Sequence, residues 1–125
     1  TPYEQFALKA RDNINLFRDT LRVERLGGKR IWGYGANAKG AVLLQAAWLG
    51  PTTMERIVDD TEQKWGQLTP GSLIPITSAA ELSEPDVLVL LSWNNAPALK
   101  AKARAHGFTG RFFVPVPVPH FAEAA

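Results

Sequence analysis

The 125-residue sequence predicts an α/β fold, an open and mostly parallel sheet flanked by helices and preceded by an amphipathic helix. Short apolar runs alternate with helical stretches, a glycine-rich turn follows the first of these runs, and the run at 87–91 contains only Val and Leu. A continuous apolar run of this kind is typical of a parallel strand that is buried on both faces. Taken together, these patterns are typical of a Rossmann-like domain.

The first predicted element is a long helix over about residues 3–26, which Gly27-Gly28 end. Apolar residues recur there every three or four positions, as they do on one face of an amphipathic helix. The chain therefore divides into an N-terminal helix, residues 1–28, and a single domain over residues 29–125 on which the helix packs. The apolar face comprises Tyr3, Phe6, Ala10, Ile14, Phe17 and Leu21.

Glycine and proline punctuate the rest of the chain and separate its predicted elements. Strands are predicted at 29–34, 54–58, 87–91 and 111–114, and helices at 41–49 and 96–106. Residues 61–77 are predicted to form a loop with short extended pieces. Ser78 is predicted to cap a short helical turn, and the proline-rich segment 115–119 to stay outside the central ladder. Packing roles are assigned to Trp32, Trp48 and Trp65.

The composition is that of an ordinary globular protein, with 46% hydrophobic and 21% charged residues. A net charge of +2 from scattered basic residues argues against nucleic acid as a partner. The absence of cysteine excludes disulfides and thiolate metal sites. Neither a signal peptide nor an apolar run approaching the ~20 residues of a membrane helix is present, so we expect a cytoplasmic protein without a membrane partner.

The glycine turn at 33–40 is the most informative motif in the sequence. A strand, a tight turn and a helix start present backbone N–H groups and the positive end of the helix dipole to one spot, which suits a phosphate or another anion. Gly33, Gly35 and Ala38 also fit the dinucleotide pattern G-x-G-x-x-G/A. The alternative is a tight turn that binds nothing.

Three side chains of this turn are candidates for the same ligand. Lys39 stands at the mouth of the helix, where the dipole disfavours a cation by ~0.3–1 kcal/mol, so an anion between them is one explanation of its position. The other explanation is a solvated surface lysine. Tyr34 and Asn37 can offer a hydroxyl and an amide to the ligand, or act as ordinary turn residues.

Two further segments follow predicted strands. Asp59 and Asp60 end the second strand, where dinucleotide-binding folds place an acid on a ribose diol, although either can simply cap the next turn. Ser92-Trp93-Asn94 follows the apolar strand. The Trp93 indole can stack on a base or sugar, and the Asn94 amide can bind a hydroxyl. The alternative is that Trp93 belongs to the core and Asn94 forms the turn. Ligands in open α/β sheets lie outside the carboxyl ends of the strands, so we expect these segments to meet there.

The sequence offers no arrangement typical of catalysis. His106 is interpreted as a helix C-cap, and His120 has no visible partner. No catalytic residue and no metal ligand are predicted. The candidate substrate-binding residues are Gly33, Tyr34, Gly35, Ala36, Asn37, Ala38, Lys39, Gly40, Asp59, Asp60, Ser92, Trp93 and Asn94.

These segments, in this order, resemble the C-terminal domain of the sugar C-methyltransferases over about residues 29–117. The family uses S-adenosylmethionine (SAM) to methylate a carbon of a nucleotide-linked deoxysugar. The resemblance implies three parts: an N-terminal zinc-binding domain, a central SAM-binding domain and this Rossmann-like domain, with the sugar nucleotide between the last two. The motifs that carry it are the glycine turn, Val58-Asp59-Asp60, Pro70-Gly71, Ile74-Pro75-Ile76, Pro85-Asp86, Ser92-Trp93-Asn94 and the run 111–115.

If the resemblance holds, this chain forms one wall of a nucleotide-sugar cleft beside a covalently adjacent SAM-binding domain. It then needs no cofactor of its own, because SAM and zinc belong to the other two domains, and by itself it transfers no methyl group. The resemblance implies that the turn holds phosphates or sugar, that Lys39 neutralises charge and that Asp59 accepts from hydroxyls. Two positions depart from the family pattern: Asn37 stands where the family usually has proline, and Asp60 where it tends to have another residue.

Two other classes of function fit the same residues. A free-standing NAD- or nucleotide-binding module would use the glycine turn and the acid at the end of the second strand. A protein-interaction domain would use the long helix and the proline segment as its interface and leave the turn empty.

Overall fold

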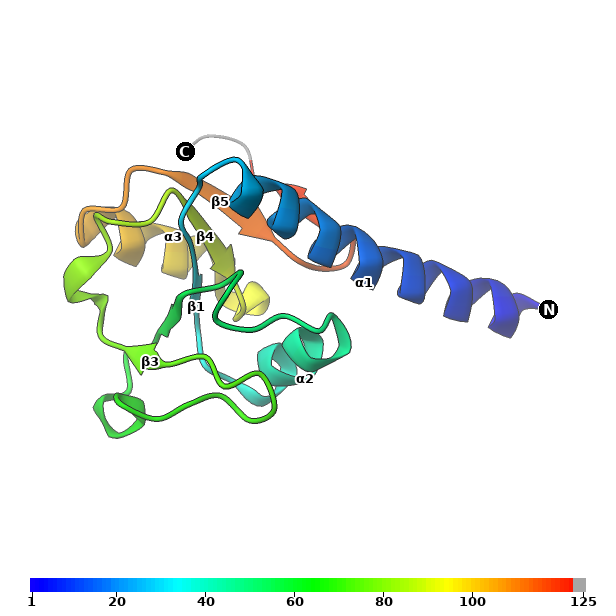
Figure 1. The fold of residues 1–125 in the computed structure, drawn as a ribbon, viewed down its shortest axis with the longest axis horizontal. Coiled ribbons are helices and arrows are strands. Elements are labelled where there is room, and N and C mark those ends of the chain that lie inside the picture. Colours follow the sequence, from blue (N-terminus) through cyan, green and yellow to red (C-terminus); the bar gives the residue numbers. More distant parts are fainter. Residues whose placement is uncertain (123–125) are drawn as a thin grey trace.

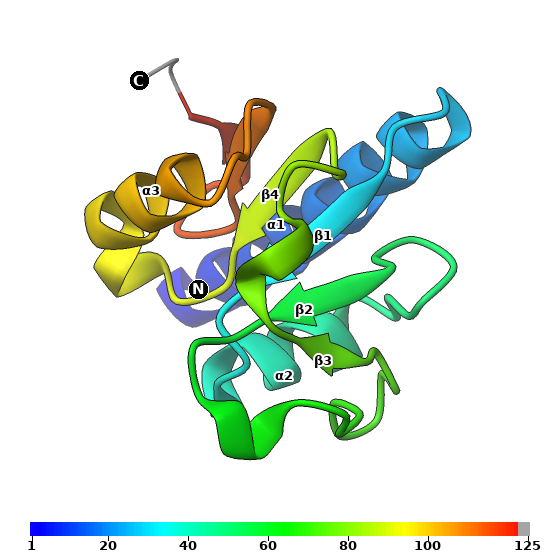
Figure 2. The ribbon, with the colours of Figure 1, turned by 90° about the vertical axis from the view of Figure 1, so that its left-hand side faces the viewer.

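The computed structural model describes residues 1–122, which form a six-stranded sheet in the order β3-β2-β1-β4-β5-β6 with helices on both faces (Figures 1 and 2). All neighbouring strands are parallel except β5 and β6. The mostly parallel α/β fold expected from the sequence is thereby confirmed; the last three residues of the predicted 29–125 domain lie outside the described residues. The strands are β1 (Ile31–Tyr34), β2 (Arg56–Val58), β3 (Ile76–Thr77), β4 (Val87–Leu90), β5 (Arg111–Val114) and β6 (His120–Phe121). The helices are α1 (Pro2–Leu26), α2 (Ala38–Ala46) and α3 (Ala96–Ala105), with short 3₁₀ turns η1 (Glu62–Lys64), η2 (Ala79–Glu81) and η3 (Trp93–Asn95).

The two central strands, β1 and β4, are buried along their whole length. Their alternate residues point to opposite faces of the sheet, so both faces of each strand are shielded from solvent. One face packs on α1 and α2, through Phe17, Leu21 and Leu44. The other face packs on α3, through Leu99 and Ala103. The apolar run at 87–91 therefore forms a central strand of the sheet, as predicted.

Helix α1 packs on the sheet only with its second half. Its first turn is capped by Thr1, whose Oγ1 accepts from the backbone N–H of Glu4 at 3.1 Å. Phe17 and Leu21 are fully buried in the core. The first half extends beyond the sheet toward the N-terminus (Figure 1).

Helix α2 begins and ends earlier than the sequence analysis predicted. It starts at Ala38, not residue 41, because the Asn37 side chain caps it by accepting from the backbone N–H of Gly40 at 2.7 Å. It ends at Ala46, and Trp48 adopts a left-handed backbone with φ of 55° that turns the chain away. The packing role assigned to Trp48 was wrong, because this side chain is 83% exposed.

The sequence analysis did not give the positions of two short strands, although it predicted short extended pieces within 61–77. β3 lies within the predicted loop at 61–77 and pairs with β2. β6 follows the proline segment and pairs with β5 in the antiparallel sense. Strands of two residues show no readable period, and only their pairing at a sheet edge defines them. Among residues 1–122, no helix combines the length and the apolar character that crossing a membrane requires.

We expect Phe17→Ala to lower the free energy of unfolding by about 3–5 kcal/mol, because it removes a fully buried aromatic ring that packs on Phe113. Urea unfolding followed by circular dichroism measures this change. Val23→Ala, an exposed position on the same helix, is the matched control and should stay within about 0.5 kcal/mol of the wild type. Equal, small effects for both variants would show that α1 does not belong to the folding unit of the sheet.

Candidate functional site

The site lies where the connections after β1 and β4 leave the sheet in opposite directions. These strands are neighbours, with Tyr34 opposite Leu90, yet α2 follows β1 on one face and α3 follows β4 on the other. Such a switch point leaves a crevice at the carboxyl ends of the strands, where open α/β folds bind ligands. The sheet topology thus brings the glycine turn beside Ser92-Trp93-Asn94, with Asp59-Asp60 at the end of the next strand.

The glycines of the turn permit the close approach of β4. Gly33 lies within β1, where a Cβ would come within 2.8 Å of the Leu91 side chain. Gly35 has a positive φ of 101°, and a Cβ there would overlap the Ser92 hydroxyl. The packing of two strand ends therefore accounts for both glycines.

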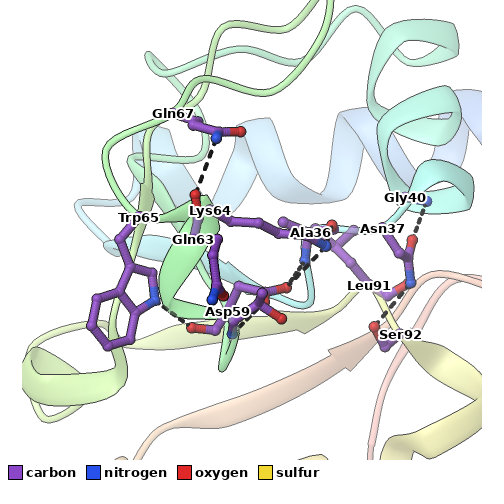
Figure 3. A network of polar contacts seen from close by, with 11 residues as sticks. Ala36, Asn37, Gly40, Asp59, Gln63, Lys64, Trp65, Gln67, Leu91 and Ser92 are labelled. Carbon is purple, nitrogen blue, oxygen red and sulfur yellow. Dashed lines mark hydrogen bonds and ion pairs between the residues drawn. The ribbon is translucent and has the colours of Figure 1, made fainter.

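Asn37 joins this turn to the end of β4 (Figure 3). Its Oδ1 caps α2, and its Nδ2 donates to Ser92 Oγ at 2.9 Å. The amide that the sequence analysis offered to a ligand is thus engaged inside the protein. Ser92 is correspondingly held by the turn.

Only part of the predicted row of backbone N–H groups remains open. The N–H of Gly35 donates to Val58 O at 2.8 Å, and that of Ala36 donates to Asp59 Oδ2 at 2.7 Å. Among residues 1–122, no hydrogen bond uses the N–H groups of Ala38 and Lys39, the first two residues of α2. The positive end of the helix dipole lies at the same place. An anion would therefore meet the start of α2 and not the whole turn.

Asp59 fixes the glycine turn from the neighbouring strand (Figure 3). Its carboxylate is buried and accepts from the backbone N–H of Ala36 with one oxygen and from that of Thr61 at 2.8 Å with the other. Lys64 Nζ donates to Ala36 O at 2.7 Å and lies 4.0 Å from Asp59 Oδ2. The Trp65 indole N–H donates to Asp59 O at 2.8 Å, which explains how a partly exposed Trp is nevertheless anchored.

Asp60 is half-exposed and belongs to a second polar group. It accepts from Tyr34 Oη at 2.7 Å and from Lys102 Nζ at 3.0 Å. Burial opposes ionisation of this carboxyl, but the hydrogen bonds from Tyr34 and Lys102 outweigh it, so the pKa of Asp60 lies below its usual value. Burial, together with the hydrogen bond to Asp60, raises the pKa of Tyr34, and the phenol keeps its proton.

Two pockets open on either side of the switch point. The first, of about 340 Å³, lies at the start of α2 and the second, of about 240 Å³, lies beside α3. Ser92 and Asn95 line both pockets, so the two adjoin, and together they are called the crevice here. The first is lined by Asn37, Ala38, Lys39, Leu91, Ser92, Trp93, Asn94 and Asn95, and the second by Tyr34, Gly35, Asp59, Asp60, Thr61, Ser92, Asn95, Ala98, Leu99 and Lys102.

The sequence analysis missed Lys64 and Lys102. Lys64 lies in a segment interpreted as a loop, and Lys102 reaches Asp60 from α3, 42 residues along the chain. No local pattern marks such partners.

Neither histidine of the chain lines the crevice. His106 ends α3 as expected, and its Nδ1 lies 2.8 Å from Lys102 O; His120 Nδ1 lies 2.7 Å from Val118 O. Among residues 1–122, no three His, Asp or Glu side chains are grouped as a metal site would require.

Residues 1–117 match the family described as "C-methyltransferase C-terminal domain". This chain belongs to that family. The domain is also 36% identical, over 127 aligned positions, to the C-methyltransferase NovU of Streptomyces niveus. The match covers 98% of this chain and 30% of that relative, which is a longer protein. The family match ends before β6, so the antiparallel edge strand of this C-methyltransferase domain lies outside it.

We expect Gly35→Ala to destabilise the domain by about 1–3 kcal/mol more than Gly28→Ala. Both glycines have positive φ and share its backbone cost of roughly 1–2 kcal/mol, but only at Gly35 does a Cβ meet another residue, Ser92. Unfolding midpoints in urea compare the two variants. Equal destabilisation would show that the β1–α2 turn does not depend on the close approach of β4.

We expect the stability of the wild type relative to Asp60→Asn to depend on pH. A carboxyl whose pKa is depressed by folding stabilises the protein above its unfolded pKa, and this contribution disappears as the pH falls through the folded pKa. The difference in urea midpoint should be constant above about pH 5 and shrink below about pH 4. A difference that stays constant down to pH 3 would mean that the ionised form gains nothing from Tyr34 and Lys102.

Proposed function

We propose that this domain forms one wall of a binding site for a nucleotide-linked deoxysugar in a SAM-dependent C-methyltransferase. Membership of the C-methyltransferase family supports the reaction class. The longer relative is itself named as a C-methyltransferase, which points the same way. The substrate class rests on the resemblance of the motifs and on the chemistry of the crevice.

The start of α2 is the observation that supports this proposal most directly. Unused backbone N–H groups of Ala38 and Lys39 adjoin the pocket that Trp93 also lines. A diphosphate can accept from these N–H groups and from Lys39 Nζ, because the helix dipole favours negative charge there. The Trp93 ring offers a flat apolar surface to a base or a sugar.

We assign the two aspartates to different tasks. Asp59 positions the glycine turn, since both of its oxygens already accept backbone N–H groups. Asp60 borders the second pocket with a half-exposed carboxylate, and it is the better acceptor for a sugar or ribose hydroxyl. Asn94 and Asn95 add exposed amides to the first pocket.

The methyl donor and the chemistry of transfer are assigned to the rest of a longer polypeptide. The chain contains no cysteine, and its described part groups no three His, Asp or Glu side chains, so its residues do not fit a zinc site. We propose that a SAM-binding domain adjoins this one in the same chain. This domain then binds and orients the sugar nucleotide that the neighbouring domain methylates.

The NAD-binding alternative would use Asp60 and not Asp59. Dinucleotide-binding folds place a carboxylate from the end of the second strand on the ribose. Asp59 is buried and engaged with Ala36 and Thr61, whereas the half-exposed Asp60 borders the second pocket. Saturable NAD binding that nucleotide sugars do not compete for would decide in favour of that alternative.

We expect the 125-residue chain to bind nucleotide-linked deoxysugars weakly and to transfer no methyl group. Isothermal titration with a panel of such compounds measures the affinity. Lys39→Ala should weaken binding about tenfold or more, as expected for the loss of one charge-assisted hydrogen bond.

The matched control is Lys29→Ala, which changes the net charge by the same amount. Lys29 precedes β1 and so lies at the amino ends of the strands, opposite the candidate site. Its affinity should equal that of the wild type. If both substitutions weakened binding equally, the effect of Lys39 would be one of net charge and not of a specific contact with the ligand. No binding of any member of the panel to the wild type would contradict the proposed substrate class.

A further inference from the structure

The apolar stripe of α1 is longer than the sheet on which the helix packs. Phe17 and Leu21 at one end of the stripe are fully buried. Tyr3 and Phe6, on the same face at the other end, are 79% and 70% exposed. This half of the helix extends beyond the sheet (Figure 1). Its apolar side chains therefore lack a covering surface among residues 1–122.

A groove runs between this half of α1 and the proline segment. Its volume is about 610 Å³. Asn13 Nδ2 donates to Pro117 O at 3.1 Å and ties the proline segment to the helix, so both walls of the groove are held. The lining is mainly apolar and comprises Phe6, Lys9, Ala10, Asn13, Ile14, Leu43 and residues 115–118.

The groove continues along α2 to the candidate site. A second apolar hollow, of about 420 Å³, shares Ile14 and Leu43 with the groove. It also shares Lys39 and Trp93 with the pocket at the start of α2. Val42, which lines this hollow, is 67% exposed. A continuous apolar strip thus leads from Phe6 to the edge of the crevice.

The opposite side of the crevice has a different character. There the ion pair between Asp60 and Lys102 borders the pocket, with Thr61 beside it. Charged groups of this kind remain hydrated at the rim of an interface, whereas an apolar patch with a polar surrounding marks a contact surface. The strip on the α1 and α2 side is therefore the better docking surface of the two.

We propose that this apolar strip docks the methyl-donor domain of the same polypeptide. The inference rests on the proposed function. This chain matches 30% of its longer methyltransferase relative, so most of such a protein lies outside the present domain. A methyl donor must reach the bound sugar, so the domain that carries it has to border the crevice. A second copy of this chain would cover the strip equally well, but it would bring no donor to the site.

Hydroxyl-radical footprinting of the complete polypeptide and of the 125-residue chain tests this placement. Phe6 and Val42 should be labelled in the chain alone and at least about fivefold less in the complete polypeptide, as expected for side chains buried in an interface. Val23 lies on the second half of α1 and is 68% exposed. It serves as the internal control and should be labelled equally in both proteins. Equal labelling of Phe6 and Val42 in both proteins would overturn the inference.

Charge substitutions give a second measurement. In the complete polypeptide, Phe6→Glu and Val42→Glu should each lower methyl transfer about tenfold or more, while Val23→Glu leaves it unchanged. In the 125-residue chain, the same variants should keep the wild-type unfolding midpoint and nucleotide-sugar affinity, since both side chains are exposed. Wild-type transfer rates for both variants would overturn the inference.

Two further outcomes separate this inference from its premises. If the wild-type chain binds no nucleotide sugar but the footprint appears, the proposed substrate class fails and the docking surface stands. Light scattering shows whether the chain alone forms a dimer. If Phe6→Glu abolishes such a dimer but leaves the labelling of the complete polypeptide unchanged, a second copy of the chain is the occupant of the strip and the inference is overturned.

Discussion

The close approach of the β1–α2 turn to the end of β4 is the contact on which the candidate site depends. It requires Gly35, because a Cβ there would overlap the Ser92 hydroxyl. The same hydroxyl accepts from Asn37, which caps α2 through Gly40. One contact therefore sets both where α2 starts and how near that start lies to Trp93. A wider spacing would separate the open N–H groups from the aromatic ring that lines the same pocket.

Burial of the two central strands on both faces explains why the crevice has two unlike sides. Because β1 and β4 are buried at every position, helices cover both faces of the sheet, and the connections after these neighbouring strands diverge. The α2 side combines a helix dipole, Lys39 and an apolar border. The α3 side holds the Asp60–Lys102 pair. A ligand with a diphosphate at one end and hydroxyl groups at the other matches this division, which is the physical basis of the proposed substrate class.

Hydrogen bonds fix the glycine turn, whereas part of the long helix stays exposed. Asp59 and Lys64 bind the N–H and the carbonyl of Ala36, so a neighbouring loop fixes the glycine turn from both sides. The long helix, by contrast, buries only its second half. The proposed function gives both features a use, because a sugar nucleotide bound in the crevice would be held in place while a neighbouring domain supplied the methyl group.

The sequence alone determined the α/β fold, the central strand and the three segments that meet at the carboxyl edge, because long apolar runs and glycine turns carry strong local signals. Only the tertiary structure decided which groups stay available to a ligand. Asn37 and Asp59, both predicted to bind it, are engaged by Ser92, Gly40, Ala36 and Thr61. Hydrogen bonds of this kind join segments far apart in the chain, so no local pattern reports them. The position of β3 and the presence of β6 could not be predicted for the same reason, since pairing with a neighbour is what makes two residues a strand.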